Sequence, residues 1–117
     1  MQQKTQTFND GVVNIYSVGN IAQQGNIPKD GLALKAGPLR YEERTVGMSR
    51  FWIALQAQAR IDMLLRVPRF KNVSTQDIAI PNDGEQYRIE QIQYPADTAL
   101  PVMDLSLQRL EAKYEIN

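Results

Sequence analysis

Four basic residues gather in a short stretch near the middle of the chain and are its strongest candidates for a binding surface. They are Arg60, Arg66, Arg69 and Lys71, with only Asp62 as an opposing charge among them. Positive side chains grouped in this way suit contact with phosphate groups. A solvated strand edge, or ion pairs with the acidic C-terminal half of the same chain, would explain the same cluster structurally.

Any acid–base or metal chemistry would depend on carboxylates, because the sequence contains no histidine and no cysteine. A carboxylate-based hydrolase or metal enzyme would need Asp77, Glu85 and Glu90 to converge. Asp83, in PNDGE, lacks the alternating ligands of a calcium loop and suits a turn better. The glycines lack the spacing of a nucleotide-binding loop. We therefore predict no enzymatic activity, no metal site and no cofactor.

The composition is that of an ordinary folded domain. The chain has 117 residues, of which 43% are hydrophobic and 22% charged, which predicts one domain with a modest core. No apolar run is long enough to span a membrane, and the start, MQQKTQTFND, lacks the apolar core of an export signal. Without cysteines there are no disulfides, so a reducing compartment is compatible. We expect no membrane contact.

The charge is zero overall but unevenly distributed along the chain. Residues 1–71 hold ten Lys/Arg and five Asp/Glu, whereas residues 72–117 hold three Lys/Arg and eight Asp/Glu. A neutral chain argues against a nucleic-acid binder held by one basic face. The asymmetry reflects either a chance distribution over a mixed surface or a basic and an acidic side that pack against other copies.

Most of the chain has the residue pattern of β-strands. Strands are predicted over residues 11–18, 39–46 and 61–67, with residues 19–37 as a Gly-rich loop. Residues 102–110 alternate Met103, Leu105 and Leu107 with polar residues, which predicts a half-buried strand. Residues 1–10 are expected to be a flexible arm and residues 11–117 one domain. The C-terminal EAKYEIN either continues the last strand or leaves the body to meet a neighbour.

Residues 77–94, DIAIPNDGEQYRIEQIQY, predict a β-hairpin around which the other elements pack. The Asp-Gly pair favours a tight turn, since Gly84 tolerates a positive φ. The apolar positions change parity between Ile89 and Ile92. This change predicts either a β-bulge near Glu90 or a strand with two buried faces.

Residues 50–59, RFWIALQAQA, favour a short helix, and an extended strand is the alternative. Trp52 is expected to anchor the core or an interface. Phe51, Trp52 and Tyr87 would instead form a stacking platform if the chain were a single-stranded nucleic-acid-binding β-barrel, with residues 60–71 as its groove.

The order of these segments resembles a known family. RTVGMSRFW, ALQAQARID and LLRVPR are followed by STQDIAIPNDGEQYRIEQIQYP, and then by MDLSLQRLE with YEI at the end. Over about residues 38–116 this order resembles the head-closure, or head–tail joining (adaptor, stopper-type), proteins of long-tailed bacteriophages. Residues 1–37 form a longer N-terminal segment than short members of that family have.

The resemblance implies a small antiparallel β-barrel or sandwich with long loops and one short helix. It also implies a structural virion protein of the neck, assembled in the host bacterial cytoplasm as a six- or twelve-fold homo-oligomeric ring. Such a ring closes the DNA-filled head between a portal-bound adaptor and a tail-end protein, around packaged double-stranded DNA.

Within this interpretation the candidate residues take two roles. Arg60, Arg66, Trp52 and Tyr114 are expected at subunit interfaces, and Arg69 and Lys71 are the candidates for facing DNA. If the basic half of one copy meets the acidic half of the next, Arg66→Glu should weaken assembly and leave the fold intact.

Overall fold

The computed structural model describes residues 8–20, 30–44, 60–96 and 98–116. Within these ranges the chain forms strands and no helix, so the expected mainly β class is confirmed. The candidate helix over residues 50–59, and Trp52 with it, lies outside the described residues. The strands are β1 (Gly11–Asn20), β2 (Asp30–Arg44), β3 (Met63–Pro68), β4 (Ile78–Ile80), β5 (Tyr87–Gln93), β6 (Val102–Arg109) and β7 (Glu115–Ile116).

Six of these strands pair in a ring that closes on itself. The order is β1–β4–β5–β6–β3–β2, and β2 pairs again with β1, all antiparallel. β7 adds a short parallel pairing to the beginning of β2. Closure leaves fewer free strand edges, which are sites of uncontrolled pairing in open sheets.

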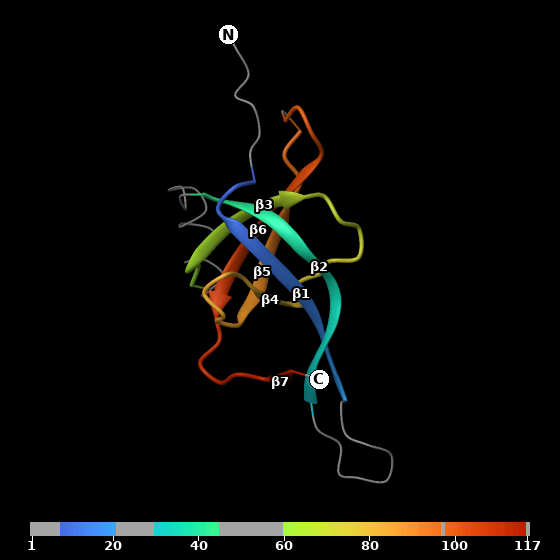
Figure 1. Ribbon diagram of the computed structural model, residues 1–117, viewed down its shortest axis with the longest axis vertical. Helices are drawn as coiled ribbons and strands as arrows, with labels where there is room; N and C mark the ends of the chain where they lie inside the picture. The colour runs from blue at the N-terminus through green and yellow to red at the C-terminus, as the bar shows by residue number, and fades with distance from the viewer. Residues whose placement is uncertain (1–7, 21–29, 45–59, 97, 117) are drawn as a thin grey trace.

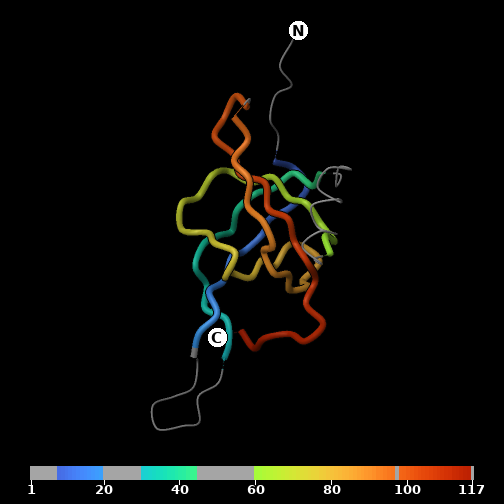
Figure 2. Tube along the Cα trace, turned by 180° about the vertical axis from the view of Figure 1, so that it is seen from behind, coloured from blue at the N-terminus to red at the C-terminus, as the bar shows by residue number. Residues whose placement is uncertain are grey.

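The ring is extended by two hairpins that reach past the body at opposite ends (Figure 1; Figure 2 from behind). One is formed by β1 and β2, whose pairing continues to Asn20 and Asp30 although β4 stops alongside Tyr16. The other is the connection between β5 and β6. These two ends therefore carry surface that the closed ring does not bury.

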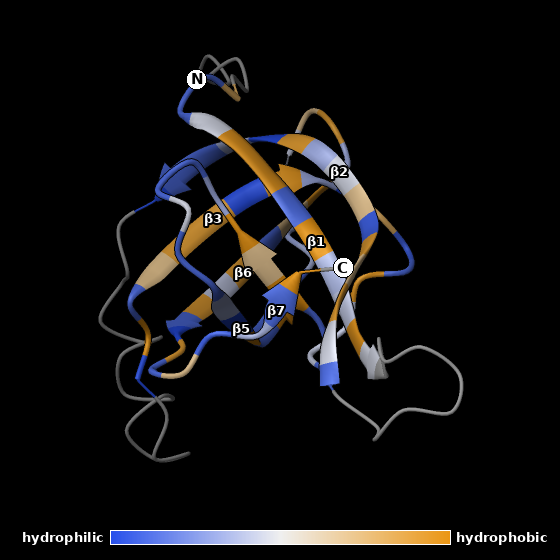
Figure 3. Ribbon diagram, turned by 60° about the horizontal axis from the view of Figure 1, so that its bottom comes forward, coloured by the Kyte–Doolittle hydropathy of each residue, from blue (hydrophilic) through white to orange (hydrophobic). Residues whose placement is uncertain are grey.

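The core fills the ring with aliphatic side chains from all six strands. Apolar and polar residues alternate along the strands, as the hydropathy colouring of Figure 3 shows for β1 and β2. Burying one aliphatic side chain contributes about 1.5–3 kcal/mol, so this cluster is the main source of stability. Its largest fully buried members are Val13, Ile15, Leu65, Val67, Ile89, Met103, Leu105 and Leu107.

The loop predicted over residues 19–37 is wrong for residues 30–37, which belong to β2. These residues pair with β1, from Asn20↔Asp30 to Ile15↔Ala36. Opposite Asn14 the register shifts, and Gly37 lies there with a φ of 123°. A Cβ on Gly37 would lie 2.6 Å from Asn14 Oδ1, so this irregular position requires glycine.

The predicted hairpin is present, but its turn is longer than expected. β4 pairs with β5 through Ala79↔Tyr87, and residues 81–86 connect them. The Gly84 N–H donates to the Pro81 carbonyl at 3.1 Å, and Gly84 has a φ of 75°. The positive φ and a tight turn at residues 81–84 are thus confirmed, but residues 85 and 86 separate this turn from β5. The predicted bulge is confirmed, because the β5–β6 register shifts between Ile89 and Gln91.

The strand predicted over residues 102–110 is present as β6, but the expectation that it is half-buried is wrong, because β6 is buried on both sides. Asp104 and Ser106, on the polar side of the alternation, are as inaccessible as the leucines beside them. β6 lies between β5 and β3, and Arg66 of β3 covers Asp104. A central strand with a covered outer face shows no exposed side, even when its sequence alternates.

Both ends of the described chain are attached to the body of the domain. Asp10 is tied to β2, because its N–H donates to the Tyr41 carbonyl at 3.0 Å and its carboxylate accepts the Glu43 N–H at 2.8 Å. The earlier residues of the predicted arm, 1–7, lie outside the described part. At the other end the chain returns to the body as β7. No helix among the described residues is long and apolar enough to cross a membrane.

Candidate functional site: an arginine-lined groove

The basic cluster read from the sequence is divided by the fold. Arg60 lies before β3, Arg66 in its middle, and Arg69 and Lys71 after its end. Because a strand rises about 3.3 Å per residue, the six residues of β3 separate the two ends of the cluster by about 20 Å. The four side chains therefore do not form one phosphate-binding surface.

Arg66 is engaged within the chain. Its guanidinium donates two hydrogen bonds to Asp104, at 2.8 Å from Nε to Oδ1 and 3.0 Å from Nη2 to Oδ2. The side chains of this pair are only 14% and 9% exposed, and the hydrogen bonds raise the pKa of Arg66 above its usual value. The structural alternative thus explains Arg66, and a contact with another subunit stays a prediction.

A second pair also joins the basic and acidic halves inside one chain. Asp77 is buried, and its Oδ2 accepts the Lys35 ammonium and the Ser74 N–H, both at 2.8 Å. Part of the charge asymmetry along the sequence is therefore neutralised by ion pairs within one chain.

Arg69 lies at the end of the molecule where β5 connects to β6. Its Nε donates to the Val102 carbonyl at 3.3 Å, and its guanidinium lies 5.0 Å from the centroid of the Tyr94 ring. Lys71 is exposed nearby in the chain and forms no ion pair within the described part. Contact of these two residues with DNA stays a prediction.

A different set of arginines is brought together at the other end of β3. The Asp62 N–H donates to the Leu107 carbonyl and its carboxylate accepts the Arg109 N–H, both at 2.8 Å, so the segment before β3 lies beside the end of β6. Arg88 of β5 pairs with Gln108 of β6. The result is a groove of about 430 Å³, which we call the arginine groove; it is lined by Arg60, Arg88, Gln108, Arg109, Leu110, Glu111, Ala112 and Tyr114.

The arginines of this groove are exposed and loosely paired. Arg60 contacts Asp62 at 3.0 Å with its side chain 61% exposed, and Arg88 lies 3.8 Å from Glu90 with its side chain 58% exposed. Arg109 forms no ion pair within the described residues. Exposed ion pairs contribute little to stability, so these guanidinium groups can exchange partners at small cost.

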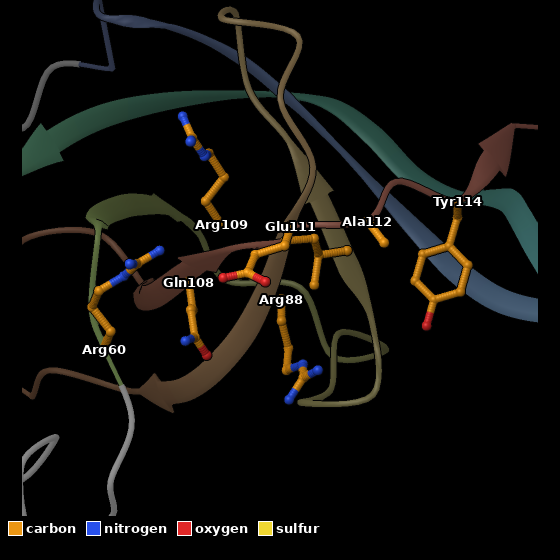
Figure 4. A pocket seen from close by; sticks show the side chains of 8 residues that line it. Arg60, Arg88, Gln108, Arg109, Glu111, Ala112 and Tyr114 are labelled. Atoms are coloured by element: carbon orange, nitrogen blue, oxygen red, sulfur yellow. The ribbon is translucent and has the colours of Figure 1, made fainter.

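The side chains enter the groove from different directions. Figure 4 shows the Glu111 carboxylate directed into the space between Arg60 and Arg88, whereas the Arg109 guanidinium points away from both. A carboxylate there shows which chemistry the groove accommodates, since planar guanidinium groups bind carboxylates and phosphates through paired hydrogen bonds.

The C-terminal segment forms one side of the groove and is held by a buried amide. Gln86 is 4% exposed; its Nε2 donates to the Tyr114 carbonyl at 2.9 Å and its Oε1 accepts the Tyr114 N–H at 2.8 Å. β7 then pairs with Gly31 and Leu32. Tyr114, half-buried, thus lines the groove, and its predicted role at an interface is untested.

A group of acidic residues surrounds the hydroxyl of Tyr41 where β1 begins and β2 ends. We call Asp10, Glu43 and Asp83 the acidic rim; all three are exposed, and none forms an ion pair within the described part of the chain. Burial raises the pKa of Tyr41, and the three carboxylates add to this increase through their charge. The turn that carries Asp83 is attached to β1, since Asn82 Oδ1 accepts the Val12 N–H at 3.0 Å.

Two alternative sites suggested by the sequence lack support from the residues that the structure describes, which do not include Phe51 and Trp52. Tyr87 cannot stack on a base, because it is 5% exposed and its hydroxyl donates to Asp83 at 2.6 Å. Asp77, Glu85 and Glu90 each contact a different cation, and the described residues contain no group of three acidic residues placed to hold a metal ion.

Arg88 and Arg109 are the groove residues that sequence reasoning missed. Each stands alone in the sequence, in the strands β5 and β6, and only strand pairing brings them near Arg60. The register of the β5–β6 pairing, which places Arg88 opposite Gln108, is the feature that could have revealed these groove residues. The bulge at Glu90 made that register impossible to count from residue numbers alone.

Comparisons with known proteins do not identify this chain. No protein-family model matches it, and no curated protein is significantly similar to it.

Proposed function

We propose that this protein is a structural subunit of a bacteriophage neck, where copies form a ring that closes the DNA-filled head and joins it to the tail. The observation that carries this proposal is a small closed ring of strands with hairpins projecting at opposite ends (Figure 1). Such a subunit has side walls for its neighbours and two ends for the assemblies above and below it.

The exposed apolar side chains support this arrangement. Leu34 on the β1–β2 hairpin is 60% exposed, and Tyr94 and Leu100 in the β5–β6 connection are 51% and 53% exposed. Large apolar side chains at both ends of a small domain suit contacts with other proteins. On this proposal one hairpin meets the adaptor bound to the portal and the other meets the tail-end protein.

Removal of the gene product from the phage that encodes it tests the proposal. We expect DNA-containing heads and separate, complete tails by electron microscopy, and expression in trans should restore joined particles. Antibody labelling of intact particles should mark the junction of head and tail. Joined, infectious particles without the protein would contradict the proposal.

Single-stranded nucleic-acid binding is the second candidate, and one observation favours it: the arginine groove has an aromatic residue, Tyr114, at its side. Stacking on an exposed aromatic ring and phosphate contacts are the usual basis of such binding. Micromolar, salt-sensitive binding of a labelled oligonucleotide by the isolated protein would favour this candidate over the neck ring.

A further inference from the structure

Asp10 and Glu43 of the acidic rim lie across the ring of strands from the arginine groove, whereas Asp83 lies in the turn that leads into β5. In the closed order β1–β4–β5–β6–β3–β2, β6 is the strand farthest from β1, and β5 is the strand farthest from β2. The groove is built on β5, β6 and the segment before β3. Asp10 and Glu43 belong to the start of β1 and the end of β2. The two surfaces therefore face different neighbours.

From this arrangement we infer that the arginine groove of one copy receives the acidic rim of a second copy. The inference rests on the proposed ring and gives it a specific contact. Because groove and rim are different surfaces, the contact is heterologous: each copy uses its groove toward one neighbour and its rim toward the other. Repetition of such a contact closes a ring when the rotation per copy divides a full turn.

The acidic rim suits the groove chemically. Its three carboxylates lack ion-pair partners in the described part of the chain, and the Asp10 carboxylate is held against the backbone of Glu43, whose N–H it accepts at 2.8 Å. Arg60 and Arg88 are exposed and loosely paired, so their guanidinium groups have hydrogen-bond donors to offer. Charge-assisted pairs of this kind set register and partner choice at interfaces.

A protein carboxylate fits this groove better than a nucleic-acid strand does. Asp62, Glu90 and Glu111 all lie in or beside the groove, so it has little net positive charge with which to hold the repeated phosphates of a long polyanion. The chain as a whole has no net charge, so no long-range field favours nucleic acid.

Disulfide cross-linking tests this contact directly, since the chain has no cysteine of its own. Ala112→Cys marks the groove at an exposed position, and Asn9→Cys marks the rim without removing its charges. Asn72→Cys, at an exposed position in the turn after β3, is the matched control. The full-length variants are mixed pairwise and oxidised, and cross-linked dimers are quantified by non-reducing electrophoresis.

We expect the Ala112→Cys and Asn9→Cys proteins to form at least about ten times more mixed dimer than the Ala112→Cys and Asn72→Cys pair, the size that 1.4 kcal/mol of preference produces. A single chain with both groove and rim cysteines should give a ladder of multimers. Arg60→Glu with Arg88→Glu in the groove partner should remove the preference, and Glu43→Lys in the rim partner should restore part of it.

Several results would overturn the inference. These are equal cross-linking to the rim and to Asn72→Cys, a predominance of Ala112→Cys homodimers, or indifference to the charge reversals. So would micromolar binding of a labelled oligonucleotide that the Arg60→Glu and Arg88→Glu changes abolish, because the groove would then hold phosphate. Failure of this contact can be told apart from failure of the proposed function. If phage lacking the protein produce untailed heads but the cysteine variants do not cross-link, the contact is wrong and the proposed function stands.

Discussion

Arg66 and the arginines of the groove differ in burial and in how closely they are paired with carboxylates. Arg66 lies in the middle of β3. Its guanidinium donates two hydrogen bonds to Asp104, and its side chain has little contact with solvent. Arg60 and Arg88 lie at one end of the same strand system, with exposed and longer ion pairs. The same residue type is therefore engaged within the chain in the middle of β3 and exposed to solvent near the end of the ring.

The physical cause of this difference is solvent. At the centre, removing a charge leaves its partner buried without compensation, which is expensive. At the edge, water and mobile neighbours replace a lost partner, and the energetic change is small. Four predictions test the contrast, in decreasing order of expected effect.

The largest effect is expected at Arg66. Arg66→Glu should place a third acidic group beside Glu42 and Asp104 and lower the free energy of unfolding by about 3 kcal/mol or more. The geometry thus changes the expectation that this substitution would leave the fold intact. Chemical denaturation followed by circular dichroism measures it, with Arg66→Met/Asp104→Leu as the control that should recover most of the stability. A stable Arg66→Glu protein would contradict the contrast between centre and edge.

The clamp on the C-terminal segment should give the next largest effect. Gln86→Leu keeps the side-chain size but removes both hydrogen bonds to Tyr114, leaving part of the buried backbone unsatisfied. We expect a loss of about 2 kcal/mol. Amide hydrogen exchange should rise around residues 111–116 before it rises in β6. Uniform protection along both segments would show that the clamp does not hold the tail.

A smaller effect is expected from the tyrosines near the acidic rim. Burial raises the pKa of Tyr87 strongly and that of Tyr41 less, so the folded state holds their protons more tightly than the unfolded state does. Their contribution is complete below the usual tyrosine pKa near 10, and stability should decrease as the pH rises above it.

Tyr87→Phe separates this pH effect from packing. The substitution removes the hydrogen bond to Asp83 and should cost about 1 kcal/mol at neutral pH. It should also flatten the loss of stability above pH 10, measured as the denaturation midpoint between pH 8 and 11. An unchanged alkaline slope would mean that Tyr87 does not retain its proton.

The smallest effect on folding is expected in the arginine groove. Arg88→Gln should change the free energy of unfolding by no more than about 0.5 kcal/mol, because its ion pair with Glu90 is long and exposed. The matched comparison is Arg66→Gln, which removes the same charge at the centre. A large loss of stability from Arg88→Gln would make the groove a structural element and weaken its assignment as a binding surface.

The sequence by itself determined much of the local structure. Alternating apolar residues indicated the strands that became β1, β3, β5 and β6, and the parity change in β5 revealed the bulge between Ile89 and Gln91. Gly84 was marked for a positive φ by its place after Asp83. These features depend on neighbouring residues, whose steric and hydrogen-bonding preferences are readable from the chain order.

The tertiary structure alone decided which charges remain available. Residues that are close in sequence, such as Arg60, Arg66 and Arg69, are separated along β3, whereas Arg60 and Arg88 line one groove from separate segments. Strand pairing also buried the polar side of β6 and made residues 30–37 part of β2. Burial and ion pairing depend on which strands lie side by side, and this follows from long-range packing that no local pattern encodes.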